Sequence, residues 1–215
     1  AYTSLHQHNK TLFAFASDNL IFIYDRQTFK QAIIETPDPS SRIIGISFFG
    51  SDLDCTLICV NTKNILYSYL LTDLTKPIKS IQLPHKIIFI ASSNLYIFFQ
   101  TEHSIIVQSI DSLFHKQNSI HTDSFLLTYT NTHKRCLISP CGRALATFTR
   151  GGTNPVIYYA PFDKKRCAVL PIQGSIMDFQ WGCSEHLIAV TANAQGTIRL
   201  WVESTTSYQL HCIKW

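Results

Sequence analysis

Few residues of this chain have the types and spacing that metal binding needs. His6 and His8 would project to one face of an extended segment, and His211 stands beside Cys212. Neither pair belongs to a set of three or four ligands with the spacing of a zinc site. A lone His near a strand end is more often a hydrogen-bonded surface residue. The sequence therefore predicts no metal and no cofactor.

Three catalytic motifs are incomplete. The segment "SDLDCTLI" from Ser51 begins like the Asp box that sialidases repeat, but it lacks the Gly and the Trp. The segment "GISFFG" (Gly45 to Gly50) lacks the spacing of a Ser hydrolase elbow, and its alternation favours a buried strand. The chain has eight Gly and no run that resembles a phosphate-binding loop. We therefore expect a protein that is not an enzyme.

The composition indicates a globular, β-rich chain without a membrane span. Of its 215 residues 46% are hydrophobic and 15% are charged, against an average charged content of about 25%. The longest apolar stretch, Ile87 to Phe99, is broken by polar residues and is shorter than the roughly 18 residues that a span needs. The first ten residues lack the charged and then apolar order of a secretory signal.

Charge and cysteine content limit the partners and the compartment. The net charge is +4, but the basic residues are scattered, whereas nucleic-acid binding usually needs a focused basic face. The seven Cys contain no CxxC pair, and most stand beside aliphatic residues, which favours a reduced, intracellular compartment over a disulfide framework. Cys136 and Cys141 flank a predicted turn, where a functional disulfide or metal role is the less favoured interpretation.

A repeat runs through the chain. Five segments share one form, a turn of small or polar residues followed by alternating β-branched and aromatic residues. Aligning Tyr24, Ser68, Gln108, Tyr159 and Trp201 gives spacings of 44, 40, 51 and 42 residues. A period near 40 to 45 with four strands per unit is typical of WD40 propeller blades. A second apolar run precedes each segment after a short turn, which predicts a hairpin in every unit.

The predicted fold class is therefore all-β, a WD40-type β-propeller. The predicted blades are residues 1–37, 38–84, 85–130, 131–172 and 173–215. Because such rings commonly close with about seven blades, we expect these five to be part of a larger ring whose missing blades follow Trp215. An isolated strand in a sandwich or barrel is the alternative reading of the Trp201 segment.

Three stretches resemble the amino-terminal propeller of the DmX and rabconnectin family, whose fungal member is the large subunit of the RAVE complex. They are "LFAFASDNLIFIYDRQTFKQAII", "ISPCGRALATFTRGGTNPVIYYAPFD" and "IMDFQWGCSEHLIAVTANAQGTIRLWVES". The resemblance implies a cytoplasmic, non-catalytic scaffold at endosomal or vacuolar membranes that helps to assemble the V-type ATPase. It implies V-ATPase peripheral subunits and RAVE-type proteins as partners, with peripheral membrane association through them. The alternative is another divergent WD40 scaffold of vesicle trafficking or signalling.

Partner-facing residues are expected on the loops, because strands hold exposed loops rigidly in place. Most aromatic residues on the predicted strands are expected in the core instead. The candidates for contact with a protein partner are charged or polar loop residues, each of which would otherwise be ordinary solvated surface: Arg26, Asp38, Lys63, His103, Arg150, Lys164, Lys165 and Arg166.

Overall fold

The fold is known from a computed structural model that describes most of the chain. The described residues are 2–7, 10–50, 55–114, 125–128, 134–139, 143–149, 151, 155–159, 167–169, 175–181, 187–192, 198–203 and 208–213. Within them all elements are β-strands except one short helix, α1 (Ile110–Phe114). The all-β prediction is confirmed for this part of the chain.

The described strands form five four-stranded sheets, with neighbouring strands consecutive in the chain. Sheet 1 contains β1 (Tyr2–Gln7), β2 (Lys10–Ser17), β3 (Leu20–Asp25) and β4 (Gln31–Glu35). Sheet 2 contains β5 (Ile43–Phe49), β6 (Thr56–Asn61), β7 (Ile65–Leu70) and β8 (Lys79–Gln82). Sheet 3 contains β9 (Ile87–Ser92), β10 (Tyr96–Thr101), β11 (Ser104–Ser109) and β12 (Phe125–Thr128).

Two further sheets follow. Sheet 4 contains β13 (Lys134–Ile138), β14 (Ala144–Thr149), β15 (Val156–Tyr159) and β16 (Cys167–Val169). Sheet 5 contains β17 (Ser175–Trp181), β18 (Leu187–Ala192), β19 (Ile198–Glu203) and β20 (Tyr208–Ile213). The chain divides into two compact units, Ala1–Leu127 and Thr128–Trp215. The five blade boundaries predicted from the sequence, which divide a single propeller domain, stay a prediction.

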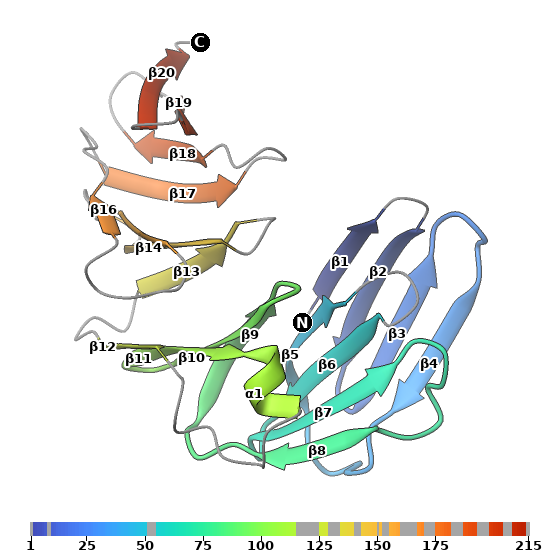
Figure 1. The fold of residues 1–215 in the computed structure, drawn as a ribbon. Helices are drawn as coiled ribbons and strands as arrows, with labels where there is room; N and C mark the ends of the chain where they lie inside the picture. The colour runs from blue at the N-terminus through green and yellow to red at the C-terminus, as the bar shows by residue number, and fades with distance from the viewer. Residues whose placement is uncertain are drawn as a thin grey trace. The chain divides into compact units, whose positions relative to one another are not determined.

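Sheet 2 packs between sheets 1 and 3 in the first unit (Figure 1). Its strand β6 is buried on both faces, and alternate side chains serve two cores. Leu57 and Cys59 join the core shared with sheet 1, whereas Ile58 and Val60 join the core shared with sheet 3. A strand covered on both faces needs apolar residues at every position, which is why this segment reads as a continuous apolar run.

The first strands of sheets 2, 3 and 5 carry the same irregularity. One extra residue bulges out of the pairing with the second strand: Ile44 in β5, Ile88 in β9 and Met177 in β17. A bulge increases the local twist and bends the strand. The sheets therefore repeat a shared backbone distortion as well as a shared order of strands.

Gly45 follows the first of these bulges, where β5 approaches β9 closely. A Cβ atom at this position would lie 2.8 Å from Ile90 Cγ1 and 3.3 Å from Ile90 N. We expect Gly45→Ala to lower the free energy of unfolding by about 1 to 3 kcal/mol, because one of the two strands must shift. Urea denaturation measures this change.

Truncating the opposing side chain supplies the control for Gly45. If the contact with Ile90 Cγ1 is the cause, Gly45→Ala should cost less in an Ile90→Ala background than in the unaltered chain, because alanine lacks the γ carbons. Equal costs in both backgrounds would show that the space beside Gly45 is not limiting.

The aromatic prediction is confirmed for the described side chains. Twelve strand aromatics are expected in the core, and ten of them have described side chains. Seven of these ten are buried and three are half-buried, the buried ones being Phe48, Phe49, Tyr67, Tyr69, Phe98, Phe99 and Tyr158 and the others Tyr96, Tyr159 and Trp181. The packing of Phe179 and Trp201 lies outside the described side chains.

Helix α1 interrupts sheet 3 between its third and fourth strands, and the sequence did not predict it. Lys79 of β8 holds the helix end, donating to the Leu113 carbonyl at 2.8 Å and the Phe114 carbonyl at 3.2 Å. Its ammonium also lies 5.5 Å from the centroid of the Phe114 ring. A cation at this end complements the helix dipole, so sheet 2 anchors the insertion of sheet 3.

Candidate interaction surface

Three of the described turns between second and third strands, those of sheets 1, 2 and 4, share a conformation and a connection. Asp18, Asn64 and Gly151 all have left-handed backbones, with φ of 51°, 61° and 82°. Each turn is bonded to the start of the next sheet. The Ile43 amide donates to the Asp18 carbonyl at 2.7 Å, the Ile87 amide to Asn64 Oδ1 at 3.0 Å, and the Gly151 amide to the Ile176 carbonyl at 2.7 Å. Asp, Asn and Gly are the residues that tolerate this backbone best.

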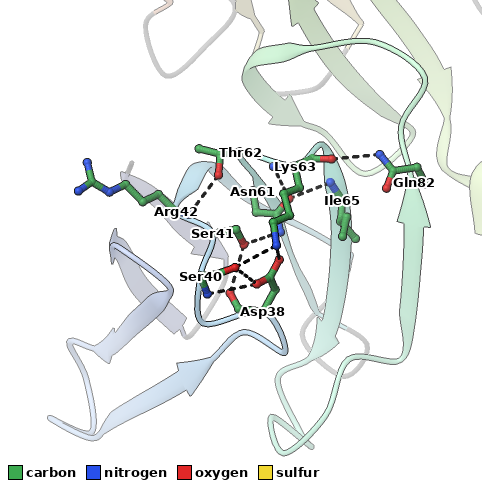
Figure 2. Close-up of polar contacts among 9 residues, drawn as sticks. All are labelled: Asp38, Ser40, Ser41, Arg42, Asn61, Thr62, Lys63, Ile65 and Gln82. Atoms are coloured by element: carbon green, nitrogen blue, oxygen red, sulfur yellow. Dashed lines mark hydrogen bonds and ion pairs between the residues drawn. The ribbon is translucent and has the colours of Figure 1, made fainter.

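The connection from sheet 1 to sheet 2 lies at this turn end, and a polar network holds it there (Figure 2). Lys63 Nζ lies 2.7 Å from Asp38 Oδ2 and donates to Ser40 Oγ at 2.9 Å. The Ser40 hydroxyl and amide donate to Asp38 Oδ1 at 2.7 and 3.1 Å. One carboxylate therefore organises its own loop and receives a cation from the neighbouring hairpin.

Asn61, which is fully buried, is the centre of the network. Its amide group donates to Ser41 Oγ at 2.7 Å, so it reaches the connecting loop. Its Oδ1 accepts the Lys63 amide at 3.1 Å and the Ile65 amide at 2.9 Å, so it also closes its own turn. Ser41 donates onward to the Asp38 carbonyl at 3.1 Å. One side chain thus fixes the geometry on which the Asp38–Lys63 pair depends.

The outer part of the network is exposed. Arg42 Nε lies 3.2 Å from Asp18 Oδ1, but the two side chains are 80% and 69% exposed. An exposed pair of this kind adds little stability. The Lys63 side chain is 55% exposed although it is bonded at its tip. Gln82 Nε2 donates to the Lys63 carbonyl at 3.0 Å, which ties the turn to the last strand of sheet 2. The surface therefore presents two ion pairs, Arg42 with Asp18 and Lys63 with Asp38, and in both the cation is the more exposed member.

The ionisation of Asp38 reports on this network. The hydrogen bonds from Lys63 and Ser40 lower the pKa of Asp38 from 3.8 to about 2. Because the pKa is depressed in the folded state, the contribution of the carboxylate to stability is complete above about pH 4 and is lost as the pH falls through about 2. We expect an NMR titration of the Asp38 carboxyl carbon to show a midpoint near 2, and Lys63→Met to move it toward 3.8.

A matched substitution distinguishes the local pair from general charge effects. Lys76→Met removes the same charge from the connection between β7 and β8 and should leave the Asp38 midpoint unchanged. A midpoint near 3.8 in the unaltered chain would contradict the bonding described here.

The structure places the predicted contact residues differently. It brings Asp38 and Lys63 together. His103 is exposed in the turn between β10 and β11, and Arg26 is exposed in the turn between β3 and β4, at the opposite end of sheet 1. Arg150, Lys164, Lys165 and Arg166 lie outside the described residues. That these residues face a partner stays a prediction.

Sequence reasoning missed the polar residues that hold the pair, namely Ser40, Ser41 and Asn61. A local signal was available for Ser40 and Asn61, but not for Ser41. Asp followed two residues later by Ser is typical of an Asx turn, and Asn immediately after an apolar strand is typical of a side chain that closes a turn.

The described residues offer little for chemistry. They contain no group of three or more His, Cys, Asp or Glu side chains that could hold a metal ion. Burial raises the pKa of the Cys59 thiol to about 12, so this cysteine is not a nucleophile at neutral pH. No described helix is long and apolar enough to cross a membrane.

Comparison with known proteins gives information on the fold. No protein-family model matches the chain, and no curated protein matches it. The β-propeller domain of Myceliophteria thermophila Cps50 (Swd1) is similar in structure at a TM-score of 0.62 and 12% identity, over 99% of this chain and 74% of that one. Kluyveromyces lactis Hsv2 is similar at a TM-score of 0.60 and 13% identity, over 93% of this chain and 60% of that one.

The same architecture also occurs in an enzyme. Kuenenia stuttgartiensis hydrazine synthase is similar at a TM-score of 0.61 and 11% identity, over 99% of this chain and 65% of that one. At such identities the likeness concerns the fold and leaves the activity open. The strand order, the repeated turns and the similar structures together show that the chain has the all-β fold of a WD40-type β-propeller.

Proposed function

We propose that this chain is a non-catalytic scaffold that binds other proteins at the turn end of sheets 1 and 2. The observation that supports this most is the polar network of Asp38, Ser40, Asn61 and Lys63, which fixes a connecting loop and a hairpin turn together. A fixed backbone presents exposed Lys63 and Arg42 without a large loss of loop entropy on binding. Loops on a rigid scaffold are frequent binding elements.

The more specific assignment is to V-ATPase assembly. It rests on the resemblance of three sequence stretches to the DmX and rabconnectin family. On this proposal the chain acts in the cytoplasm at endosomal or vacuolar membranes, and its partners are peripheral pump subunits and RAVE-type proteins.

Affinity purification of the protein from cell lysate, followed by mass spectrometry, tests both the scaffold proposal and the V-ATPase assignment. We expect a set of bound proteins that includes peripheral V-ATPase subunits. The double variant Arg42→Glu and Lys63→Glu should lose at least some of them, because it reverses the charge of the exposed end. Lys76→Glu, a charge reversal between β7 and β8, should keep them.

Different results would contradict the V-ATPase assignment and the proposed binding surface. Recovery of specific proteins without any pump subunit would contradict the V-ATPase assignment but would still support the proposal that the chain is a scaffold. An unchanged set of proteins with the double variant, whose folding is checked by circular dichroism, would show that binding occurs elsewhere on the molecule.

A further inference from the structure

The turn between β3 and β4 displays a phenylalanine to solvent. Phe29 is 74% exposed, more than any other large apolar side chain that the structure describes. Its backbone is left-handed, with φ of 56°, a conformation in which bulky residues are rare and glycine is common. Glycine would suit this position better, and what phenylalanine adds is an apolar ring in water. A side chain that opposes both preferences indicates a partner that covers it.

The turn is bonded so that Phe29 keeps its place. The Asp25 carboxylate accepts the Gln27 amide at 2.9 Å through Oδ1 and the Thr28 hydroxyl at 2.6 Å through Oδ2. The Asp25 amide donates to the Lys30 carbonyl at 2.9 Å, which closes the turn. Because these bonds fix the backbone, a partner that binds Phe29 orders little that is not already ordered.

Stacking of neighbouring sheets leaves a turn of this kind open. Sheet 2 is packed on both faces, by sheets 1 and 3, so it shows what a neighbouring sheet covers. The connection between β7 and β8 is braced in a similar way, since the Thr75 hydroxyl donates to Asp73 Oδ1 at 2.6 Å. Ile78 of that connection is still 50% exposed. A further sheet packed on sheet 1 is therefore not expected to cover Phe29.

The charges beside Phe29 indicate an anionic partner with an apolar interior. Arg26 and Lys30 stand on either side of Phe29 in the chain, and both are exposed. The acid of the turn, Asp25, has both carboxylate oxygens bonded within the turn. A membrane surface offers negative headgroups to such cations and apolar chains to the ring between them. A protein would need a preformed pocket to enclose a side chain that projects from a turn, whereas lipids rearrange around it.

We propose that the turn between β3 and β4 binds an anionic lipid surface directly, with the Phe29 ring among the headgroups and with Arg26 and Lys30 on the phosphates. The turn lies at the end of sheet 1 opposite to the turn that faces the Asp38–Lys63 pair. Lipid and protein partners therefore bind at different places. The proposal goes beyond the scaffold function and does not depend on the V-ATPase assignment.

Cosedimentation of the full 215-residue chain with phosphatidylcholine vesicles, with and without about 30% phosphatidylserine, tests the proposal. We expect binding to the anionic vesicles that weakens as salt is added, and little binding to the neutral ones. Phe29→Gly should weaken binding about 10-fold because the ring is lost. The same change should keep or raise the urea midpoint, because glycine suits the left-handed backbone. Phe29→Trp should keep the binding.

Two results would overturn the proposal at this stage. One is a chain that binds neither kind of vesicle. The other is a Phe29→Gly variant that binds anionic vesicles as well as the unaltered chain. The scaffold proposal is tested separately, because Phe29→Gly should not change the proteins recovered from lysate. If Phe29→Gly lost such proteins and no vesicle bound the chain, the partner of this turn would be a protein and the lipid proposal would be wrong.

Matched substitutions distinguish this turn from general charge and hydrophobicity. Arg26→Gln and Lys30→Gln should each weaken binding to anionic vesicles about 5-fold. Lys86→Gln removes the same charge from an exposed residue between β8 and β9 and should have no such effect. Phe89→Ala removes a ring that is 41% exposed on a strand and should leave binding unchanged. Equal effects of the substitutions inside and outside the turn would contradict binding at Phe29.

Discussion

Replacing Phe99 with alanine is expected to lower the free energy of unfolding by about 3 to 5 kcal/mol. Phe99 is 1% exposed and belongs to the core between sheets 2 and 3, which also contains Ile58, Val60 and Ile90. Its loss leaves a cavity that strands on both sides border, and strands held in a ladder cannot collapse into it easily. Urea denaturation followed by far-ultraviolet circular dichroism measures the change.

Phe89→Ala is the matched control for Phe99. Phe89 lies in the neighbouring strand β9, and its side chain is 41% exposed. The same truncation there should cost less than about 1 kcal/mol. If the two substitutions were equally costly, the assignment of one side chain to the core and the other to the surface would be wrong. A small effect of both would mean that sheets 2 and 3 do not share a tightly packed core.

The hairpins were predictable from sequence because their signals are local. Alternating apolar residues around Asp18 and around Thr62 and Lys63 mark two strands and a turn, and the structure has β2 to β3 and β6 to β7 at these places. Strand β9 (Ile87–Ser92) was not predicted, because its residues Ile87 to Ala91 are apolar at consecutive positions and show no alternation. A run of this kind fixes neither the period nor the place of a strand end.

The candidate site was only partly predictable for a physical reason. Asp38 and Lys63 were each predicted as surface residues, but their contact depends on how sheet 1 packs against sheet 2. That packing is set by many apolar side chains, such as Ile23 and Leu57, and by the bulge in β5. No short motif contains this information. The turn residues Asp38 and Asn61 reveal their local bonds in the sequence, whereas the bond from Asn61 to Ser41 appears only in the folded chain.

Asn61→Ala is expected to lower the free energy of unfolding by about 2 to 4 kcal/mol, more than any other single change in the polar network. Asn61 is fully buried, and its side chain makes three bonds: to Ser41 Oγ and from the amides of Lys63 and Ile65. Alanine leaves these groups to find other partners in a place from which water is excluded. The turn of sheet 2 and the loop from sheet 1 lose their common support together.

Asn94→Ala supplies the comparison for Asn61. Asn94 is exposed, and its Oδ1 accepts the Gly50 amide at 3.2 Å, a bond that water can replace. We expect its loss to cost less than about 1 kcal/mol by the same urea measurement. The Asn61 variant should also shift the Asp38 titration upward, because the loop that aligns Asp38 with Lys63 is released. A stable Asn61→Ala chain with an unchanged Asp38 midpoint would contradict this role of Asn61. It would show that the Asp38–Lys63 pair forms without Asn61, and that other contacts make the turn end of sheets 1 and 2 rigid.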